Sequence, residues 1–231
     1  MNTSKLNYFT KAELALWLCS ETAIIASNLA MGRGIGLSLL ASVIGVTALI
    51  FNAKGNPTGP ALMVVFSLMY GYISFGFAYY GEMLTYVGMS MPMAVVSFFT
   101  WMKNPFKGNR AEVTVNLHIS PAERVFMAVL TAAVTVIFYY ILKYFNTANL
   151  IPSTVSVATS FAAVYLSFRR NPYFAFVYAI NDIVLIVLWV LASLHDASYL
   201  SVVVCFAAFL VNDMYSFINW KRISRRQSEA A

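Results

Sequence analysis

Hydrophobic residues occur along this chain in long blocks that short polar segments interrupt. The apolar blocks occupy residues 35–53, 58–79, 83–101, 121–145, 150–168, 172–194 and 197–220. A tight loop is expected at Tyr80-Gly81-Glu82, between the second and third blocks. At a rise of about 1.5 Å per residue, roughly twenty apolar residues match the hydrocarbon core of a bilayer. The pattern therefore predicts an all-α membrane protein with seven transmembrane helices.

The same order of turn residues and apolar blocks occurs twice in the chain. Asn56-Pro57 precedes two apolar blocks that end at Trp101, and Asn171-Pro172 precedes two that end at Trp220; one more block lies before each copy. A three-helix unit that followed its copy directly would be inverted, but the block at 121–145 restores the direction. We therefore expect a parallel 3+1+3 repeat with an axis along the membrane normal. Such repeats place the substrate site between the halves, near mid-membrane.

The N-terminal segment allows two interpretations. Thr10 and Glu13 have the spacing of a capping box and open a helix that runs to about Ala30. Its polar positions recur about every seven residues and share one face. We expect an amphipathic helix at the membrane surface, and we keep open a spanning helix whose polar stripe faces the bundle.

The expected organisation has five parts. A short extended piece is expected within residues 112–118, and a second capping box at Ser120 to Glu123 opens the linker helix. The parts are the N-terminal tail and helix (1–34), the first repeat (35–101), the cytoplasmic loop and linker helix (102–149), the second repeat (150–220) and a basic cytoplasmic tail (221–231).

Composition agrees with a lipid environment. The chain is 60% hydrophobic and 10% charged, with a mean hydropathy of +0.72, whereas soluble domains carry about 25% charged residues. The net charge of +6 comes from residues between the apolar blocks, so we expect no nucleic-acid partner. Eleven of the fifteen Lys and Arg residues lie on the side of the C-terminal tail, or thirteen if the N-terminal helix spans. The C-terminus is therefore expected in the cytoplasm, and the protein in the cell membrane.

Two acidic residues inside the apolar blocks are the best indication of function. Asp182 lies about 18 Å into the membrane from Arg170, and Asp213 about 12 Å from Lys221, at 1.5 Å per residue. An intramembrane carboxylate costs about 2.5–3.5 kcal/mol and suggests a functional site. The two acids could bind substrate hydroxyls or a cation, carry a coupling proton, or be structural and hydrogen-bonded to hydroxyls.

Polar and aromatic neighbours extend this candidate substrate site. Asn181 and Asn212 precede the two acids, and an amide offers both donors and an acceptor to a polar ligand. Tyr70, Tyr86, Tyr178 and Trp189 lie deep in their blocks, where one or two could stack on a flat ring.

Enzyme signatures are missing from the sequence. His118 and His195 lie in loops without a nucleophile or metal-ligand cluster nearby, and no Walker motif is present. We expect no enzymatic activity, no cofactor and no metal. Cys19 and Cys205 are expected to be free thiols, and a disulfide between them stays open.

The pattern resembles the PnuC family of vitamin transporters, which are similar to the SWEET sugar facilitators. The matching features are the 3+1+3 layout, residues 79–83, Pro92 with Trp101, and Asn181, Asn212 and Trp220, within residues 35–222. The resemblance implies uptake of nicotinamide riboside or a related nucleoside-like vitamin by facilitated diffusion with alternating access. It also implies a homotrimer, and it gives Asn181 and Asn212 as ligand-binding residues.

The chain departs from the family at one place. Carriers of nicotinamide riboside have a Trp-x-x-Trp pair at the start of the sixth span, where this chain has Phe174 and Val177, or Tyr173 and Phe176. Phe174 therefore joins the candidate site residues. Uptake of thiamine, riboflavin or deoxynucleosides, proton-coupled transport and a non-transporting membrane scaffold are the alternatives.

Overall fold

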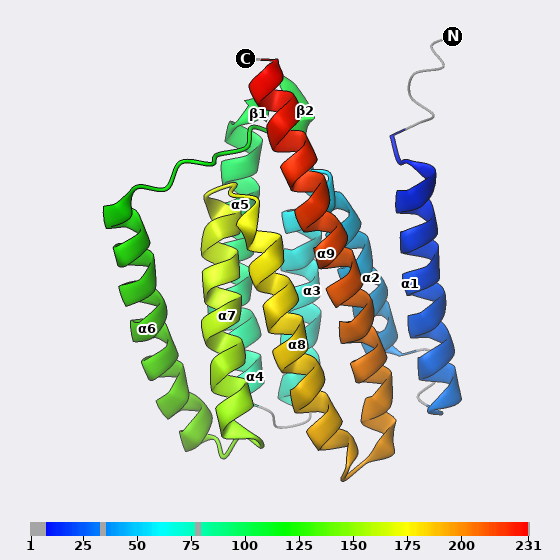
Figure 1. Ribbon diagram of the computed structural model, residues 1–231. Helices are drawn as coiled ribbons and strands as arrows, with labels where there is room; N and C mark the ends of the chain where they lie inside the picture. Colours follow the sequence, from blue (N-terminus) through cyan, green and yellow to red (C-terminus); the bar gives the residue numbers. More distant parts are fainter. Residues whose placement is uncertain (1–7, 33–35, 77–79, 231) are drawn as a thin grey trace.

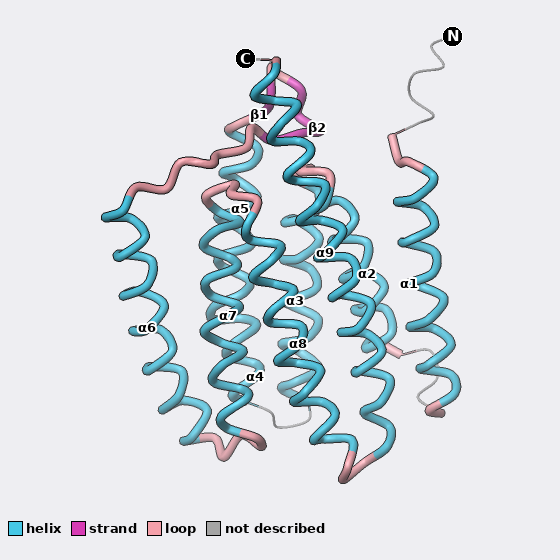
Figure 2. Tube along the Cα trace, in the orientation of Figure 1, coloured by secondary structure: helices cyan, strands magenta, loops and turns pink. Residues whose placement is uncertain are grey.

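The computed structural model describes residues 8–32, 36–76 and 80–230, which form a bundle of roughly parallel and antiparallel helices (Figure 1). The helices are α1 (Lys11–Ala30), α2 (Leu37–Ala53), α3 (Thr58–Gly76), α4 (Tyr80–Leu84), α5 (Met91–Lys103), α6 (Pro121–Tyr144), α7 (Leu150–Phe168), α8 (Tyr173–Ser193) and α9 (Leu200–Glu229). A π-helical turn, Thr85–Ser90, joins α4 to α5, and a 3₁₀ turn, Ala197–Tyr199, precedes α9. Strands β1 (Pro105–Phe106) and β2 (Asn109–Val113) form a small antiparallel hairpin (Figure 2).

The prediction of an all-helical membrane protein is confirmed at this level. Six helical segments in the described part of the chain are long and apolar enough to cross a membrane, and α2 is a shorter apolar helix of 17 residues. Two expected boundaries are wrong. Tyr80–Glu82, expected as a loop, begins α4. The expected tail after Trp220 continues α9 to Glu229, while Ala231 lies outside the described residues.

Six of the segments close a ring. Around the ring, α2 packs on α3, α3 on α5, α5 on α7, α7 on α8, α8 on α9, and α9 on α2. Helices α1 and α6 lie outside this ring. Helix α1 covers the seam between α9 and α2, while α6 packs on α7 and touches α4 (Figure 1). The ring therefore encloses a central space, and each flanking helix covers one side of it.

The buried polar stripe of α1 explains where this helix lies. Glu13, Ser20, Glu21 and Asn28 are all buried, whereas Leu14 and Leu18, on the other face, are exposed. Asn212 of α9 donates to the Ser20 hydroxyl at 2.9 Å. The structure therefore agrees with the second interpretation, in which the polar stripe of α1 faces the bundle. Helix α1 does not lie flat against one end of the bundle.

The turns after α2 and α7 have the same construction. Gly55 and Arg170 both adopt positive φ, 66° and 58°, a conformation in which glycine is unstrained and arginine is not. The next residue, Asn56 or Asn171, donates its backbone N–H to the carbonyl of the residue five positions earlier, at 3.0 Å in both turns. Each Asn side chain then accepts from the residue that starts the next helix, at 2.8 and 3.1 Å.

The segment between α5 and α6 ties both turns together. Val113 donates its backbone N–H to the Gly55 carbonyl at 2.9 Å, and Asn116 donates to the Arg170 carbonyl at 3.0 Å. Gln227, in the extension of α9, accepts from the Val115 N–H at 2.8 Å and donates to the Val113 carbonyl at 3.0 Å. The extension of α9 is thus packed against the hairpin.

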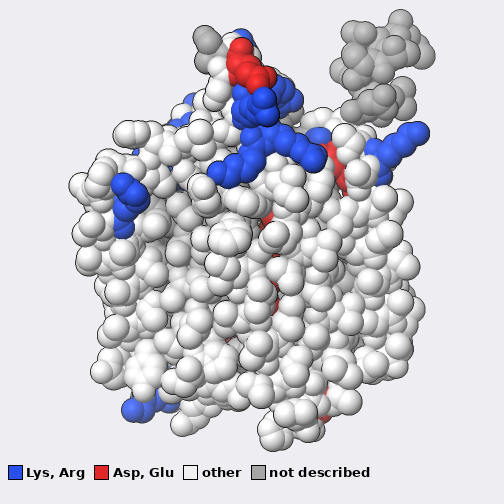
Figure 3. All heavy atoms as spheres, viewed as in Figure 1, with Lys and Arg blue, Asp and Glu red and all other residues white. Residues whose placement is uncertain are grey.

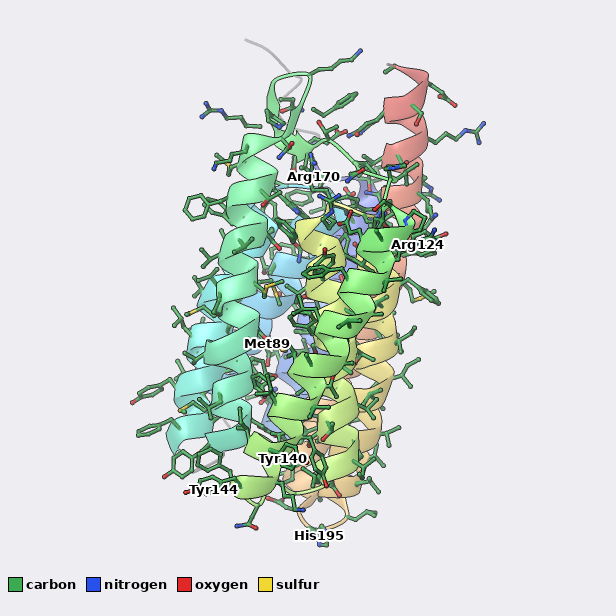
Figure 4. The ribbon with its side chains drawn as sticks, turned by 90° about the vertical axis from the view of Figure 1, so that its left-hand side faces the viewer. Met89, Arg124, Tyr140, Tyr144, Arg170 and His195 are labelled. Carbon is green, nitrogen blue, oxygen red and sulfur yellow. The ribbon has the colours of Figure 1, made fainter. Side chains whose placement is uncertain are left out.

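Basic residues gather at this end of the bundle, which we call the basic end (Figure 3). It carries the hairpin, the turns after α2 and α7, and the C-terminal end of α9. Arg124 lies at the same end of α6, whereas Tyr140 and Tyr144 lie toward the opposite end, with His195 (Figure 4).

Candidate functional site

The ring of helices encloses a cavity of about 140 Å³, which we call the central cavity. Its wall comes from both halves of the chain, including α2, α3, the π-helical turn, α5, α7, α8 and α9. Six of the residues predicted from the sequence line it: Tyr86, Tyr178, Asn181, Asp182, Trp189 and Asp213.

Asp182 and Asp213 meet in this cavity. They come from the antiparallel neighbours α8 and α9, and their carboxyl groups lie within hydrogen-bonding reach of one another. Their side chains are 3% and 2% exposed. Asp182 Oδ2 and Asp213 Oδ1 have no hydrogen-bond partner within the described ranges, and no Lys, Arg or His is among the described residues that line the cavity. Two buried carboxyl groups without a counter-charge require a proton, a cation or a polar ligand.

Asn181 is held by hydroxyl groups from the neighbouring helix. Its Oδ1 lies 3.1 Å from the Ser156 hydroxyl, 2.7 Å from that of Thr159 and 3.1 Å from that of Ser160, all on α7. Among the described residues its Nδ2 amide finds no acceptor. The contacts therefore fix the side chain through its oxygen and leave its N–H donors for a ligand.

The sequence reasoning missed a row of small hydroxyl side chains on α7. Ser153, Ser156, Ser160 and Ser167 all line the central cavity. Their spacing of three, four and seven residues places them on one helical face, a signal that was visible in the sequence. Ser67, Ser90 and Ser97 add hydroxyls from the first half of the chain.

A third carboxyl group, Glu82, was also missed because its segment was expected to be a loop. In the structure Glu82 is on α4 and lines the central cavity. The helix then continues through the π-helical turn, in which the backbone N–H of Met91 bonds to the Tyr86 carbonyl, five residues earlier. Such turns often mark functional sites. Pro92 is the second residue of α5, in the first turn after the π-helical segment.

A second, larger cavity of about 810 Å³, the vestibule, opens at the end of the bundle opposite to the basic end. It is lined by the start of α2, the end of α3 and the turn between α8 and α9, including Ser38, Gly76 and Asp196. Tyr70, a predicted site residue, lines the vestibule. Its ring centroid lies 5.3 Å from that of Tyr86 and 4.7 Å from that of Phe66, and these two residues line the central cavity.

Two predicted site residues lie outside both linings. Asn212 is 1% exposed, and its amide donates to the Ser20 hydroxyl and the Ala208 carbonyl, so it joins α9 to α1. Phe174 is buried toward the basic end, 5.0 Å from Trp220 and 6.2 Å from Trp101 between ring centroids. This aromatic cluster closes the bundle between the central cavity and the basic end.

Both cysteines are free thiols: Cys19 is exposed, and Cys205 is buried in the vestibule wall. Within the described ranges, no group of three or more His, Cys, Asp or Glu side chains could hold a metal ion.

Comparisons with known proteins agree with this architecture. The nicotinamide riboside transporter PnuC of Neisseria mucosa is 25% identical over 217 residues, which cover 93% of this chain and 82% of the relative. The transporter of the same name from Haemophilus influenzae is 20% identical over 191 residues, 82% of this chain and 81% of the relative.

A solved structure shows the same fold. The crystal structure of the vitamin B3 transporter PnuC superposes with a TM-score of 0.81 at 22% identity and covers 96% of both chains. Residues 35–222 match the family described as nicotinamide mononucleotide transporter. That match spans both turns, the central cavity and every candidate site residue, so the chain belongs to the nicotinamide mononucleotide transporter family, in which its relatives are the PnuC proteins.

Proposed function

We propose that this protein takes up nicotinamide riboside across the cell membrane by facilitated diffusion, alternating between two states that open on opposite sides. The observation that carries the proposal is the central cavity itself. It holds three carboxyl groups, a fixed amide and aromatic rings, without a basic residue among its described lining. Nicotinamide riboside combines a flat cationic ring with a hydroxyl-rich sugar, and both of the named relatives are nicotinamide riboside transporters.

Each group in the cavity suits one part of such a substrate. The acid pair, Asp182 with Asp213, supplies the negative charge for the pyridinium ring. Tyr86, Tyr178 and Trp189 offer aromatic faces, in place of the Trp-x-x-Trp pair that the chain lacks. The Asn181 N–H donors and the serine hydroxyls of α7 suit ribose hydroxyls or the carboxamide.

The acid pair also supports a second candidate, proton-coupled transport. Two carboxyl groups in contact within an apolar bundle are best stabilised when they share one proton. A cationic substrate that binds there would release that proton. Uptake stimulated by an imposed pH gradient would favour this candidate over a facilitator, whereas uptake that follows the substrate gradient alone would favour the facilitator.

Uptake into proteoliposomes tests the proposed substrate. We expect saturable accumulation of labelled nicotinamide riboside, and a rise of at least tenfold in Kd for Asp182→Asn and Asp213→Asn, equivalent to about 1.4 kcal/mol. Glu229→Gln, on the exposed end of α9, is the matched control and should bind as the parent does. Thiamine, riboflavin and deoxynucleosides form the comparison panel, and thermal stabilisation by one of these alone would assign the site to that ligand.

We also propose the membrane arrangement. The helices α2 to α5 and α7 to α9 form two like-oriented three-helix units with α6 as the linker, and α1 spans as the counterpart of α6. This is supported by the matching turns and by the flanking positions of α1 and α6. The gathering of Lys and Arg at the basic end supports a cytoplasmic C-terminus (Figure 3). Protease or thiol-label accessibility in oriented vesicles would test it.

A homotrimer is part of this proposal. Of the 24 residues of α6 only Leu142 is buried within one chain, and the exposed face carries large apolar side chains such as Phe126, Ile137 and Tyr140. This face can pack against a second copy as well as against lipid. Native mass spectrometry in detergent should give a mass of three chains, and a monomer would contradict the proposal.

A further inference from the structure

Glu82 occupies a special position between the two cavities. Among the described residues, only Glu82 and Trp189 line both the central cavity and the vestibule. The two side chains come from different halves of the chain, Glu82 from α4 and Trp189 from α8. The two side chains therefore form the border that the central cavity and the vestibule share.

The Glu82 carboxylate has no assigned structural role. Among the described residues it forms no hydrogen bond or ion pair. Other carboxylates within the bundle are engaged: Glu21 accepts from Thr47, and Asp182 and Asp213 contact one another. An unpaired carboxylate inside a membrane carries a large desolvation penalty. A ligand that supplies a hydrogen-bond or charge partner reduces this penalty.

Acidic side chains lie on both sides of Glu82 along the route from the vestibule to the acid pair. The exposed Asp196 lines the vestibule toward the surface, and the acid pair lies further in. Tyr86, one helical turn after Glu82, lines the central cavity together with Glu82 and the acid pair, so all of these groups face the same enclosed space. No Lys, Arg or His is among the described residues that line the vestibule. The whole route therefore favours a cation over a neutral or anionic solute of the same size.

The volumes indicate where a substrate would first stop. Small-molecule sites usually measure about 300–1,000 Å³. The vestibule, at about 810 Å³, can hold a whole nucleoside, whereas the central cavity, at about 140 Å³, must enlarge before it can. A substrate that arrives from the vestibule thus meets Glu82 before the acid pair becomes accessible.

From these observations we infer that Glu82 is a second cation-binding station, in series with Asp182 and Asp213. It holds the positively charged ring of a flat organic cation against the Trp189 and Tyr86 faces before the ring moves to the acid pair. This inference rests on the proposed transport function and adds to it a residue that selects for charge at the mouth of the central cavity.

The test compares two ligands of nearly equal shape and different charge: nicotinamide riboside, a cation, and its reduced dihydro form, which is neutral. We expect Glu82→Gln to raise the KM for uptake of the cation about tenfold and to leave the KM of the neutral form within twofold. Glu82→Asp, which keeps the charge, should restore at least half of the loss on a logarithmic scale. Glu229→Gln, on the exposed end of α9 and outside the linings of both cavities, is the control and should change both by less than twofold.

Several outcomes would overturn the inference. An equal loss for both ligands in Glu82→Gln would show a structural role, as would a lowered Tm that Glu82→Asp does not rescue. An unchanged KM for both ligands would show that Glu82 makes no contact with the substrate. If the parent protein binds no nicotinamide riboside, the proposed function fails, and the same Glu82 variants are then compared with thiamine. A selective loss for that cation supports the station, and its absence overturns it.

Discussion

Trp101 and Trp220 donate the same hydrogen bond across the molecule. Trp101 Nε1 donates to the Ser167 carbonyl at 2.9 Å, and Trp220 Nε1 donates to the Asn52 carbonyl at 2.7 Å. Ser167 and Asn52 precede the two matching turns, so each tryptophan from one half caps the first ring helix of the other. The rings also contact one another, with centroids 5.3 Å apart. This exchange locks the two halves together at the basic end.

The matching hydrogen bonds predict nearly equal losses of stability for two substitutions that lie far apart in the sequence. Trp101→Phe and Trp220→Phe keep an aromatic ring in the cluster but remove a donor, so each should cost about 0.5–1.5 kcal/mol. Melting temperatures of the purified protein in detergent would measure this. Trp189→Phe is the matched control, because Trp189 donates no hydrogen bond to any described residue, and it should change Tm less than either. A large difference between the first two variants would contradict the equivalence of the halves.

Much of this fold was visible in the sequence because a bilayer imposes long uniform blocks. The predicted spans agree with the helices within a few residues wherever a turn signal such as Asn56-Pro57 or Asn171-Pro172 follows. The error at Glu82 has a physical cause. In the sequence, glycine at position 81 favours a turn, but a Cβ there would lie 2.8 Å from Leu142 Cδ2. Glycine is present so that α4 and α6 can approach, and not because the chain turns.

The candidate site was predicted less completely than the fold. Helical spacing from Arg170 and Lys221 brought Asp182 and Asp213 to similar depths, and their contact follows from the antiparallel packing of α8 and α9. The same reasoning could not separate Asn181 from Asn212. Each precedes an acid, but which face of a helix meets the cavity depends on the position of α1, and the sequence left that position open.

The two asparagines should therefore respond differently to alanine. Asn181→Ala removes the fixed donors in the central cavity and should raise the Kd for substrate at least fivefold. It should also lower Tm, because three hydroxyl groups of α7 lose their acceptor. Asn212→Ala breaks the bond between α9 and α1 and leaves Ser20 without that donor, so it should lower Tm, at a cost of about 1–3 kcal/mol. Binding and melting measured on the same preparations would distinguish them. Equal loss of affinity would place Asn212 in the site after all.

The contact between Glu13 and Lys54 should stabilise the protein far more than an exposed ion pair. Lys54 Nζ lies 3.0 Å from Glu13 Oε2, with side chains 15% and 2% exposed, and Tyr215 of α9 donates to the same carboxylate at 3.1 Å. Removing one partner of a buried pair costs about 3–5 kcal/mol, so Glu13→Gln should lower Tm clearly. Glu229→Gln breaks the exposed pair with Arg225 and should have almost no effect.

The second half contains a similar pair, which provides an internal comparison. Arg169 pairs with Glu123, in the first turn of α6, and these side chains are 30% and 21% exposed. Because solvent screens this pair more than that of Glu13, Glu123→Gln should lower Tm by an intermediate amount. If the two variants destabilise in the reverse order, burial does not set the strength of these contacts.

Gly59 should be the glycine whose replacement disturbs the first half most directly. A Cβ at this position of α3 would lie 2.6 Å from the backbone nitrogen of Asn52 on α2, and a backbone atom cannot move aside as a side chain can. Alanine in a helix normally gains up to about 1 kcal/mol over glycine, but overpacking costs about 1–3 kcal/mol or more. We therefore expect Gly59→Ala to lower Tm. Since Asn52 lines the central cavity, substrate affinity should fall as well. Gly88→Ala is the control, because a Cβ at Gly88 meets no described atom within 4 Å. If both variants melt at the same temperature as the unsubstituted protein, α2 and α3 do not need this close approach.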